Sequence, residues 1–349
     1  MNNLFVMKQL VEDFFKLKEF NTSIQKELLA GFTTFVTMAY IVFVNPQIMA
    51  LTGMDQGAVF VGTCIAAALA CLLMGLFANW PIGLAPGMGL NAFFTFTVVG
   101  ELGYSWEVAL GSVFLAGILF FLMSVTRLRS WMIESIPLNL RIAMGAGVGL
   151  FIGFIGLKSG GIIVSNDATF LKLGDLSNQE TLLAAVGFLV ISVLAIRKVP
   201  GAILIGVLST TLIALLLGLV QFNGLVSMPP SLGPIFLKLD ILGALNISMI
   251  TIIMSFLFVN LFDTTGTLLG VANRANLVDA EGNADNLDKA LKADSSVSFI
   301  GTFFGCSPVT SYVESSAGVE AGGRTGLTAV FIGLFFILTM FLSPLALIV

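Results

Sequence analysis

The residues that could do chemistry gather in two polar stretches of an otherwise apolar sequence. The first stretch, 306–316, carries Glu314 between two long apolar runs. The second, 255–267, carries Asn260 and Asp263, which are three positions apart and therefore share one face of a helix. A carboxylate at membrane depth is costly and is rarely kept without a function. The two stretches therefore favour a ligand site inside a membrane protein, with Glu314 at its centre.

Several of the candidate residues also have a structural explanation. Asp263 can cap or bond a neighbouring helix, and Asn91 can serve as polar glue between helices. Tyr312 fits packing as well as ligand contact. Phe93, with Phe94 beside it, is the aromatic pair that we consider as a stacking wall for a flat ligand. The residue types alone leave these alternatives open.

The composition places all of these residues in a polytopic membrane protein. Hydrophobic residues make up 57% of the chain and charged residues 10%, and the mean hydropathy is +1.02, far outside the range of soluble globular proteins. The three cysteines lie in apolar segments, so no disulfide framework is expected. Histidine is absent, so any proton coupling must use carboxylates. Asp294 and Glu320 lie near predicted span ends, where we expect them to be solvated.

One short motif has an enzymatic appearance. Residues 263–267, Asp-Thr-Thr-Gly-Thr, resemble the Asp-Thr-Gly turn of aspartic proteases and the phosphorylated aspartate motif of P-type ATPases. The lysine of the ATPase motif is missing, no loop is long enough for a nucleotide domain, and no P-loop is present. An intramembrane protease needs two aspartates that share a proton, and only one lies deep here. We therefore predict a protein that is not an enzyme, with no catalytic residues and no metal.

Apolar runs long enough to cross a bilayer recur along the chain. We predict spans at 27–49, 57–79, 83–99, 106–126, 138–157, 180–196, 201–220, 248–272, 289–305, 306–323 (broken) and 325–349. With residues 1–26 as an amphipathic cytoplasmic segment, thirteen of the 16 Lys and Arg residues fall on the cytoplasmic side. This excess of positive charge predicts a cytoplasmic N-terminus in a plasma-membrane protein.

The third and tenth predicted spans look alike. Both open with proline, at Pro86 and Pro308, and both place a polar residue five or six positions later, at Asn91 and Glu314. Seven spans separate them, so the two copies run in opposite directions, as in the inverted repeats of transporters. We predict a first seven-span repeat over 27–220, a loop at 221–247 on the extracellular side, and the first four spans of a second repeat over 248–349. The last three spans of that repeat are then expected to be absent, as in a truncated chain.

Three ordered motifs carry a family resemblance. Residues 83–94 (GLAPGMGLNAFF), 261–268 (LFDTTGTL) and 307–315 (SPVTSYVES) resemble the azaguanine-type (AzgA-like) purine permeases of the nucleobase:cation symporter and nucleobase–ascorbate transporter superfamily. The resemblance implies an all-α fold of fourteen spans in two inverted sevens, divided into core and gate domains, with spans three and ten each half strand and half helix. It also implies proton-coupled uptake of adenine, guanine or hypoxanthine, with no cofactor and often a homodimer; the sequence leaves open whether H⁺ or Na⁺ is the coupling ion.

The resemblance also implies roles for residues. Glu314 would hydrogen-bond the purine and Asn91 would contribute from the third span, while Asp263 would support the site or take part in proton coupling together with Glu314. Asn260 stands where members of the family usually carry Asp. Asparagine still donates and accepts hydrogen bonds, but it cannot titrate, so base preference and coupling stoichiometry stay open. Tyr312 and Phe93 complete the predicted substrate-binding set.

Two other functions are considered. The same fold could carry uracil, xanthine or an inorganic anion, although an acidic site without a deep Lys or Arg disfavours the anion. A truncated chain could also be inactive in transport and serve as a sensor or assembly partner.

Overall fold

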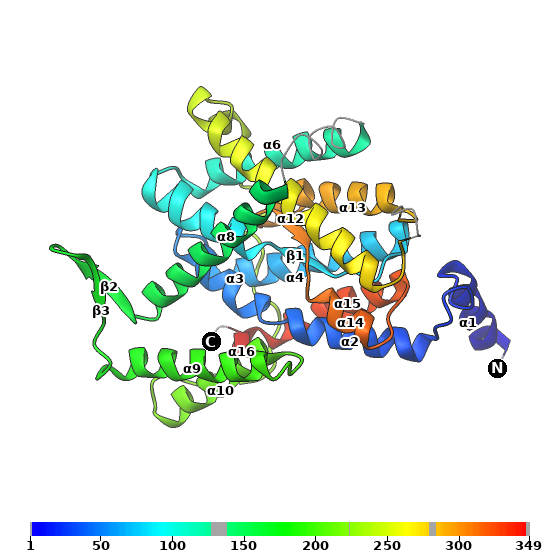
Figure 1. Cartoon of the computed structure of the whole chain (residues 1–349), viewed down its shortest axis with the longest axis horizontal. Helices are drawn as coiled ribbons and strands as arrows, with labels where there is room; N and C mark the ends of the chain where they lie inside the picture. Colours follow the sequence, from blue (N-terminus) through cyan, green and yellow to red (C-terminus); the bar gives the residue numbers. More distant parts are fainter. Residues whose placement is uncertain (1, 127–137, 223, 279–283, 347–349) are drawn as a thin grey trace.

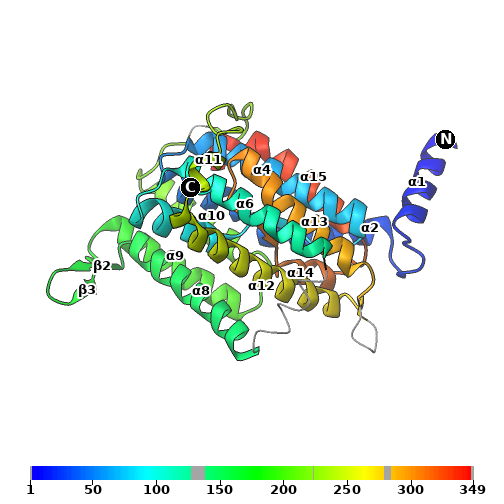
Figure 2. The same cartoon turned by 90° about the horizontal axis from the view of Figure 1, so that it is seen from above.

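The computed structural model describes residues 2–126, 138–222, 224–278 and 284–346, and it shows a bundle of long helices (Figures 1 and 2). Within the described residues, six helical segments are long and apolar enough to cross a membrane. They are Ile24–Ala50, Gln56–Ala78, Trp106–Val125, Gln179–Ile196, Ile247–Arg274 and Gly326–Ala346. Multiple membrane-spanning helices are thus confirmed, while the side of the membrane on which the N-terminus lies stays a prediction.

The helices follow the predicted spans closely, and the bounds of the elements are as follows. The first part of the chain contains α1 (Asn2–Phe14), α2 (Ile24–Met38), α3 (Ile41–Ala50), α4 (Gln56–Leu73), a π-helix (Met74–Ala78), β1 (Leu84–Pro86), α5 (Met88–Ala92), a second π-helix (Phe93–Glu101) and α6 (Trp106–Val125). The middle contains α8 (Leu138–Ser159), β2 (Ile163–Asn166), β3 (Phe170–Leu173), α9 (Gln179–Ile196), α10 (Ala202–Leu216) and α11 (Ile241–Ala244). The last part contains α12 (Ile250–Arg274), α13 (Leu287–Ile300), β4 (Val309–Ser311), α14 (Ser315–Glu320), α15 (Gly326–Thr339) and α16 (Ser343–Ala346), with short 3₁₀ segments beside them.

Two short strands cross at the centre of the bundle. β1 and β4 pair antiparallel, with Ala85 opposite Thr310 (Figure 1). Each strand leads into a short helix, α5 after β1 and α14 after β4, so the expectation that spans three and ten are half strand and half helix is confirmed. Pro86 is the last residue of β1 and Pro308 directly precedes β4, so both prolines lie in the extended parts of these segments, where their restricted backbone is tolerated. At Gly87 a Cβ atom would lie 2.8 Å from Thr310 Cγ2, so only glycine lets the two segments approach this closely.

The core is built around this crossing. α15 packs against α2 and α4, and α13 packs against α6 and the first π-helix (Figure 2). Fully buried aromatic side chains fill the spaces between these helices, among them Phe60, Phe256 and Phe336. α9 and α10 pack against each other at one side of the bundle, and α10 contacts α2. The crossing strands are therefore held by helices from both ends of the sequence.

Three details differ from the sequence-based expectation. The first span is broken at Ala39–Tyr40, between α2 and α3, whereas a continuous helix over 27–49 was expected. The last span, expected over 325–349, stops as an α-helix at Thr339 and continues as a 3₁₀ turn and α16; its final residues, 347–349, lie outside the described residues. A β-hairpin, β2–β3, occupies part of the connection between α8 and α9. The 7+7 inverted repeat, with its core and gate domains, and the domain limits stay predictions.

A buried carboxylate joins the two ends of the described chain. Glu27 on α2 is 0% exposed, and it accepts hydrogen bonds from the backbone N–H groups of Arg324 (3.0 Å), Thr325 (3.3 Å) and Thr328 (3.2 Å) and from the Thr328 hydroxyl (2.5 Å). These amides belong to the first turn of α15, where a helix leaves its N–H groups without internal partners. Glu27 therefore caps α15 from a distant helix.

Replacing Glu27 by alanine is expected to lower the free energy of unfolding by about 2–4 kcal/mol, because several buried donors lose their acceptor at once. The midpoint of thermal unfolding of the purified protein in detergent measures the effect. Glu101→Ala is the control, since Glu101 is exposed at the end of a π-helix. Equal midpoints for the two variants would contradict the capping role.

Candidate functional site

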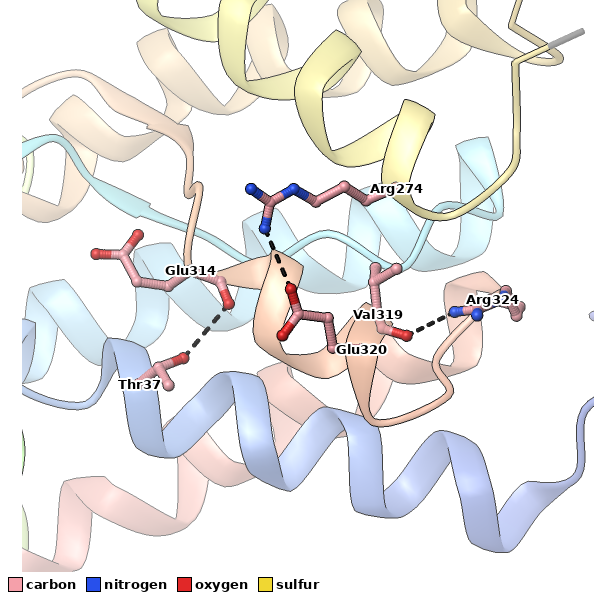
Figure 3. A network of polar contacts seen from close by, with 6 residues as sticks. All are labelled: Thr37, Arg274, Glu314, Val319, Glu320 and Arg324. Carbon is pink, nitrogen blue, oxygen red and sulfur yellow. Dashed lines mark hydrogen bonds and ion pairs between the residues drawn. The ribbon is translucent and has the colours of Figure 1, made fainter. Parts of the chain in front are cut away.

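Glu314 lies between β4 and α14, at the crossing of the two strands. Its side chain is half-buried. The Tyr40 hydroxyl donates to Glu314 Oε1 at 3.2 Å, and the Thr37 hydroxyl donates to the Glu314 backbone oxygen at 3.5 Å (Figure 3). Both partners come from the end of α2 and the break that follows it. The broken first span thus supplies a hydrogen-bond donor that orients the Glu314 carboxylate.

A nearby ion pair does not neutralise Glu314. Arg274 and Glu320 form an exposed ion pair at 3.3 Å. Figure 3 shows the Glu314 carboxylate pointing away from this pair. The solvated position expected for Glu320 is confirmed by the 71% exposure of its side chain. The carboxylate of Glu314 is therefore free to act on a ligand.

Asp263 is the second carboxylate at this place. It lies on α12, and its side chain is exposed. On the same face, a Cβ atom added at Gly266 or Gly270 would meet nothing within 4 Å, so this face of the helix borders open space. α12 contacts both β4 and α14, the two elements that flank Glu314, so the two carboxylates are close enough for their charges to interact. The structure thus brings the two predicted carboxylates together beside an open helix face.

Tyr312 lies behind these carboxylates and is 6% exposed. Its hydroxyl donates to the Pro86 backbone oxygen at 2.5 Å, which ties the segment after β4 to β1. Its ring belongs to the same group of interacting residues as Tyr40, Glu314 and Asp263. The position of Tyr312 therefore suits support of the site more directly than contact with a ligand.

Asn260 is turned into the protein. It is 3% exposed, and its amide donates to Ser298 Oγ at 2.9 Å. Ser298 in turn donates to the Val309 backbone oxygen at 2.7 Å, so Asn260 on α12 helps to hold β4. The Asn260 side-chain oxygen has no hydrogen-bond partner among the described residues. A role for Asn260 in ligand contact stays a prediction.

A third carboxylate near the strand crossing, that of Asp294, was expected to be solvated, and that expectation is wrong. Asp294 is 0% exposed. Thr264 donates to Asp294 Oδ1 at 2.9 Å and lies 3.0 Å from the Thr310 hydroxyl of β4. Asp294 is buried because its helix, α13, packs between α6 and the first π-helix. It thus belongs to a polar layer behind the strand crossing.

Asn91 lies in a polar network on the other side of the crossing. It is 0% exposed and donates to the Asn45 side-chain oxygen, while the Ser307 hydroxyl donates to Asn91. Asn45 also donates to Thr63 Oγ1 at 2.6 Å. The network connects α3, α4, α5 and the residue that precedes Pro308. Asn91 therefore forms hydrogen bonds that link neighbouring helices. Contact between Asn91 and a ligand stays a prediction.

The two candidate stacking residues separate in the structure. Phe93 is half-buried and packs edge-to-face with Phe256 of α12, with 5.1 Å between the ring centroids. Phe94 is fully buried in the hydrophobic core. Only Phe93 is therefore placed to offer part of its surface to a ligand.

The polar groups of the site are hydrogen-bond acceptors, namely carboxylates, together with hydroxyl groups. The ionisable groups that interact with Glu314 are Tyr40, Tyr312 and Asp263, none of which carries a positive charge. Among the residues that could be searched, no cluster of three or more metal-ligating side chains occurs. Such a site can accept hydrogen bonds from a neutral ligand rich in N–H groups, and its carboxylates can take up protons.

Sequence reasoning missed Tyr40, Thr37 and Asp294. Tyr40 had a usable signal, since it is a polar aromatic residue inside an apolar run, five positions before Asn45 and six before Pro46. Its partner, however, is 274 positions away along the chain. Local sequence could therefore mark Tyr40 as unusual but could not assign it to Glu314.

Comparison with known proteins agrees with this architecture. The sequence profile of the Permease family (Xan_ur_permease) matches residues 25–349. The chain is 49% identical to the adenine permease AdeP of Escherichia coli K12, over 97% of this chain and 76% of that protein. It is 45% identical to the guanine/hypoxanthine permease PbuO of Bacillus subtilis 168, over 95% of this chain and 78% of that protein.

A more distant likeness concerns the fold alone. The transmembrane domain of the cyanobacterial bicarbonate transporter BicA superimposes with a TM-score of 0.62 at 14% identity, covering 92% of this chain and 85% of that one. SLC26A9 superimposes with a TM-score of 0.61 at 15% identity, covering 92% of this chain and 55% of that one. The overall fold of this chain is thus shared with these two proteins.

Proposed function

The chain belongs to the Permease family, and from this membership we propose that it imports purine nucleobases by proton symport. It is a transporter and not an enzyme, as its family and its transporter-named relatives indicate. Relatives that are 43–49% identical and are named as adenine or guanine/hypoxanthine permeases support the purine cargo. The single structural observation that carries the proposal is the pairing of Glu314 with Tyr40 beside Asp263, at the crossing of β1 and β4.

The proposed binding mode follows from the chemistry of a purine. A purine is flat and neutral, with N–H donors and ring-nitrogen acceptors along its edges. The Glu314 carboxylate accepts ring N–H groups, and Tyr40 keeps the carboxylate oriented. The half-buried ring of Phe93 offers a surface for stacking. Hydrogen bonds with a carboxylate are among the stronger ones, so Glu314 contributes most of the specificity.

The proposed coupling uses the two carboxylates. When both are charged, Asp263 and Glu314 repel each other. A proton taken up between them removes this repulsion and changes how many hydrogen bonds the pair can accept or donate. Asp263 is the more accessible of the two, because it borders the open face of α12. We therefore assign proton entry to Asp263 and purine binding to Glu314.

The proposal is tested by uptake and by binding. Radiolabelled adenine, guanine, hypoxanthine and uracil are supplied to cells that lack their own purine permeases and express this chain, with and without a protonophore. We expect accumulation of at least one purine that the protonophore abolishes. Binding of the same bases to the purified protein separates recognition from transport. A chain that reaches the membrane but neither binds nor accumulates any purine would overturn the proposal.

A second cargo is considered because the fold neighbours include a bicarbonate transporter. The interacting groups around Glu314 are acidic or neutral, and a negatively charged substrate would be repelled there. Uracil or xanthine would meet no such repulsion, so the uracil arm of the uptake experiment, extended to xanthine, distinguishes these bases from the purines adenine, guanine and hypoxanthine.

Replacing Tyr40 by phenylalanine is expected to weaken purine binding about 3- to 10-fold, because one hydrogen bond that holds the Glu314 carboxylate is removed while the ring is kept. Equilibrium binding of the preferred purine to purified protein measures this change. Tyr104→Phe is the matched control, since the Tyr104 hydroxyl bonds to Ser248 at an exposed position. A Tyr40→Phe variant with unchanged affinity would remove Tyr40 from the site.

A further inference from the structure

The N-terminal helix α1 is not used by the proposed transport site. α1 (Asn2–Phe14) stands apart at one end of the bundle, and its axis lies crosswise to α2 in both views (Figures 1 and 2). Residues 15–23 connect it to α2, which begins the first membrane-spanning segment. Because this connection is short, α1 must lie close to the membrane surface.

One side of α1 is apolar and uncovered. Met7, Leu10 and Phe14 follow helical spacing, and their exposed fractions are 64%, 64% and 59%. We call these three residues the α1 stripe. Lys8 and Glu12 lie on the opposite side of the helix and form an ion pair at 3.8 Å. Large apolar side chains gathered on one face in this way mark an interaction surface rather than a random scatter.

The orientation of the α1 stripe is fixed by the protein. Val11 is partly buried, and it packs with Phe15 (5% exposed) and Leu17 (1% exposed) in a cluster that includes Leu327 and Phe331 of the α15 region. Val11 lies beside the α1 stripe on the helix, not within it. The cluster therefore anchors one edge of α1 while the stripe itself faces away from the bundle.

We propose that the α1 stripe inserts into the interfacial layer of the lipid bilayer, between the headgroups and the acyl chains. A helix that lies in the membrane plane with an apolar face and a charged opposite face has the properties of such interfacial helices. The side-chain charges of residues 2–23 sum to zero: the three positive residues are Lys8, Lys16 and Lys18, and the three negative ones are Glu12, Asp13 and Glu19. Insertion is therefore driven by apolar burial and depends little on the charge of the lipids.

The partner is the bilayer rather than a second protein because of where α1 is placed. The helix sits at the end of α2, whose own exposed apolar side chains, Leu29 (57%) and Phe32 (50%), belong to the spanning segment. α1 lies beyond the N-terminal end of α2, at the same end of the bundle as these exposed side chains (Figures 1 and 2). A bilayer that surrounds α2 is thus within reach of α1 without any further component.

The experiment places a probe on each side of α1 in the full chain. Leu10→Cys and Gln9→Cys variants are labelled with a maleimide fluorophore, because the three native cysteines are buried and the unmodified chain reports any background labelling. Each protein is reconstituted at one copy per nanodisc in phosphatidylcholine, with a nitroxide placed at a shallow position of the acyl chain. We expect at least about threefold stronger quenching for the Leu10→Cys label than for the Gln9→Cys label.

Two further arms keep the result decisive. Replacing a third of the phosphatidylcholine by phosphatidylglycerol is expected to leave the quenching ratio unchanged, since the side-chain charges balance. A Met7→Glu substitution in the Leu10→Cys background is expected to reduce quenching, because a charge is costly in the apolar layer. Equal quenching on both sides of α1 would overturn the proposal. So would protection of the Leu10→Cys label that occurs only in discs holding two copies, which would identify a second copy as the partner.

Discussion

Replacing Glu314 by glutamine is expected to weaken purine binding by about 10- to 150-fold, which corresponds to about 1.5–3 kcal/mol for a hydrogen bond with a charged group. The change keeps the size of the side chain and removes its charge. Glutamine can accept only at one oxygen and presents an amide NH2 donor where the carboxylate had a second acceptor. It would also meet Tyr40, the present donor to Glu314 Oε1. Equilibrium binding of purine to purified protein is the measurement.

Glu320→Gln is the matched control for this variant. Glu320 is the last residue of α14, the short helix that begins directly after Glu314, but its side chain is 71% exposed and its partner is Arg274. An exposed ion pair of this kind contributes little to stability, and its loss should not reach the site. If both variants bind purine equally well, Glu314 is not the residue that recognises the base. If only Glu314→Gln loses affinity while both unfold at the same temperature, the loss belongs to recognition.

Replacing Asp263 by asparagine is expected to abolish concentrative uptake while leaving purine binding within about threefold of the original affinity. Symport with one proton moves one positive charge across the membrane with each purine. A membrane potential of 100 mV then supplies about 2.3 kcal/mol, which corresponds to about 50-fold accumulation of the purine inside the cell. Asparagine cannot take up a proton, so the variant should only equilibrate the purine. No hydrogen bond to Asp263 is found among the described residues, so the substitution leaves the surrounding contacts intact.

The measurement is the ratio of internal to external purine, with and without a protonophore, in cells that express each variant. Asp167→Asn serves as the control, because Asp167 is exposed in the turn between β2 and β3. Undiminished protonophore-sensitive accumulation by Asp263→Asn would exclude Asp263 from coupling. Loss of binding together with loss of accumulation would instead place Asp263 among the residues that contact the purine.

Asn260 is compatible with the fold, although the purine permeases that this sequence resembles usually carry aspartate at this position. Its amide donates to Ser298, which in turn holds the Val309 backbone oxygen. An aspartate at this position could not donate that hydrogen bond. The buried amide therefore fits the partners around it, and the site keeps Asp263 and Glu314 as its accessible carboxylates.

The sequence by itself determined the elements and the positions of the costly groups. Apolar length predicted the six membrane-spanning segments of the described residues to within a few residues, because crossing a bilayer imposes a minimum apolar length that is visible locally. Pro86 and Pro308 marked the two broken spans, because a proline in a helix interior removes a backbone hydrogen bond and disfavours a continuous helix. Glu314 and Asp263 were evident because a carboxylate in an apolar run has a high energetic cost.

Only the tertiary structure decided which of these groups meet. Glu314 and Tyr40 are 274 positions apart, and Asn91 and Ser307 are 216 apart, so no local pattern reports these pairs. Asp294 was expected to be solvated because it lies near the end of a predicted span, yet its side chain is 0% exposed. Burial and hydrogen-bond partners depend on which helix faces come together, and this is decided by the packing of segments that lie far apart along the chain.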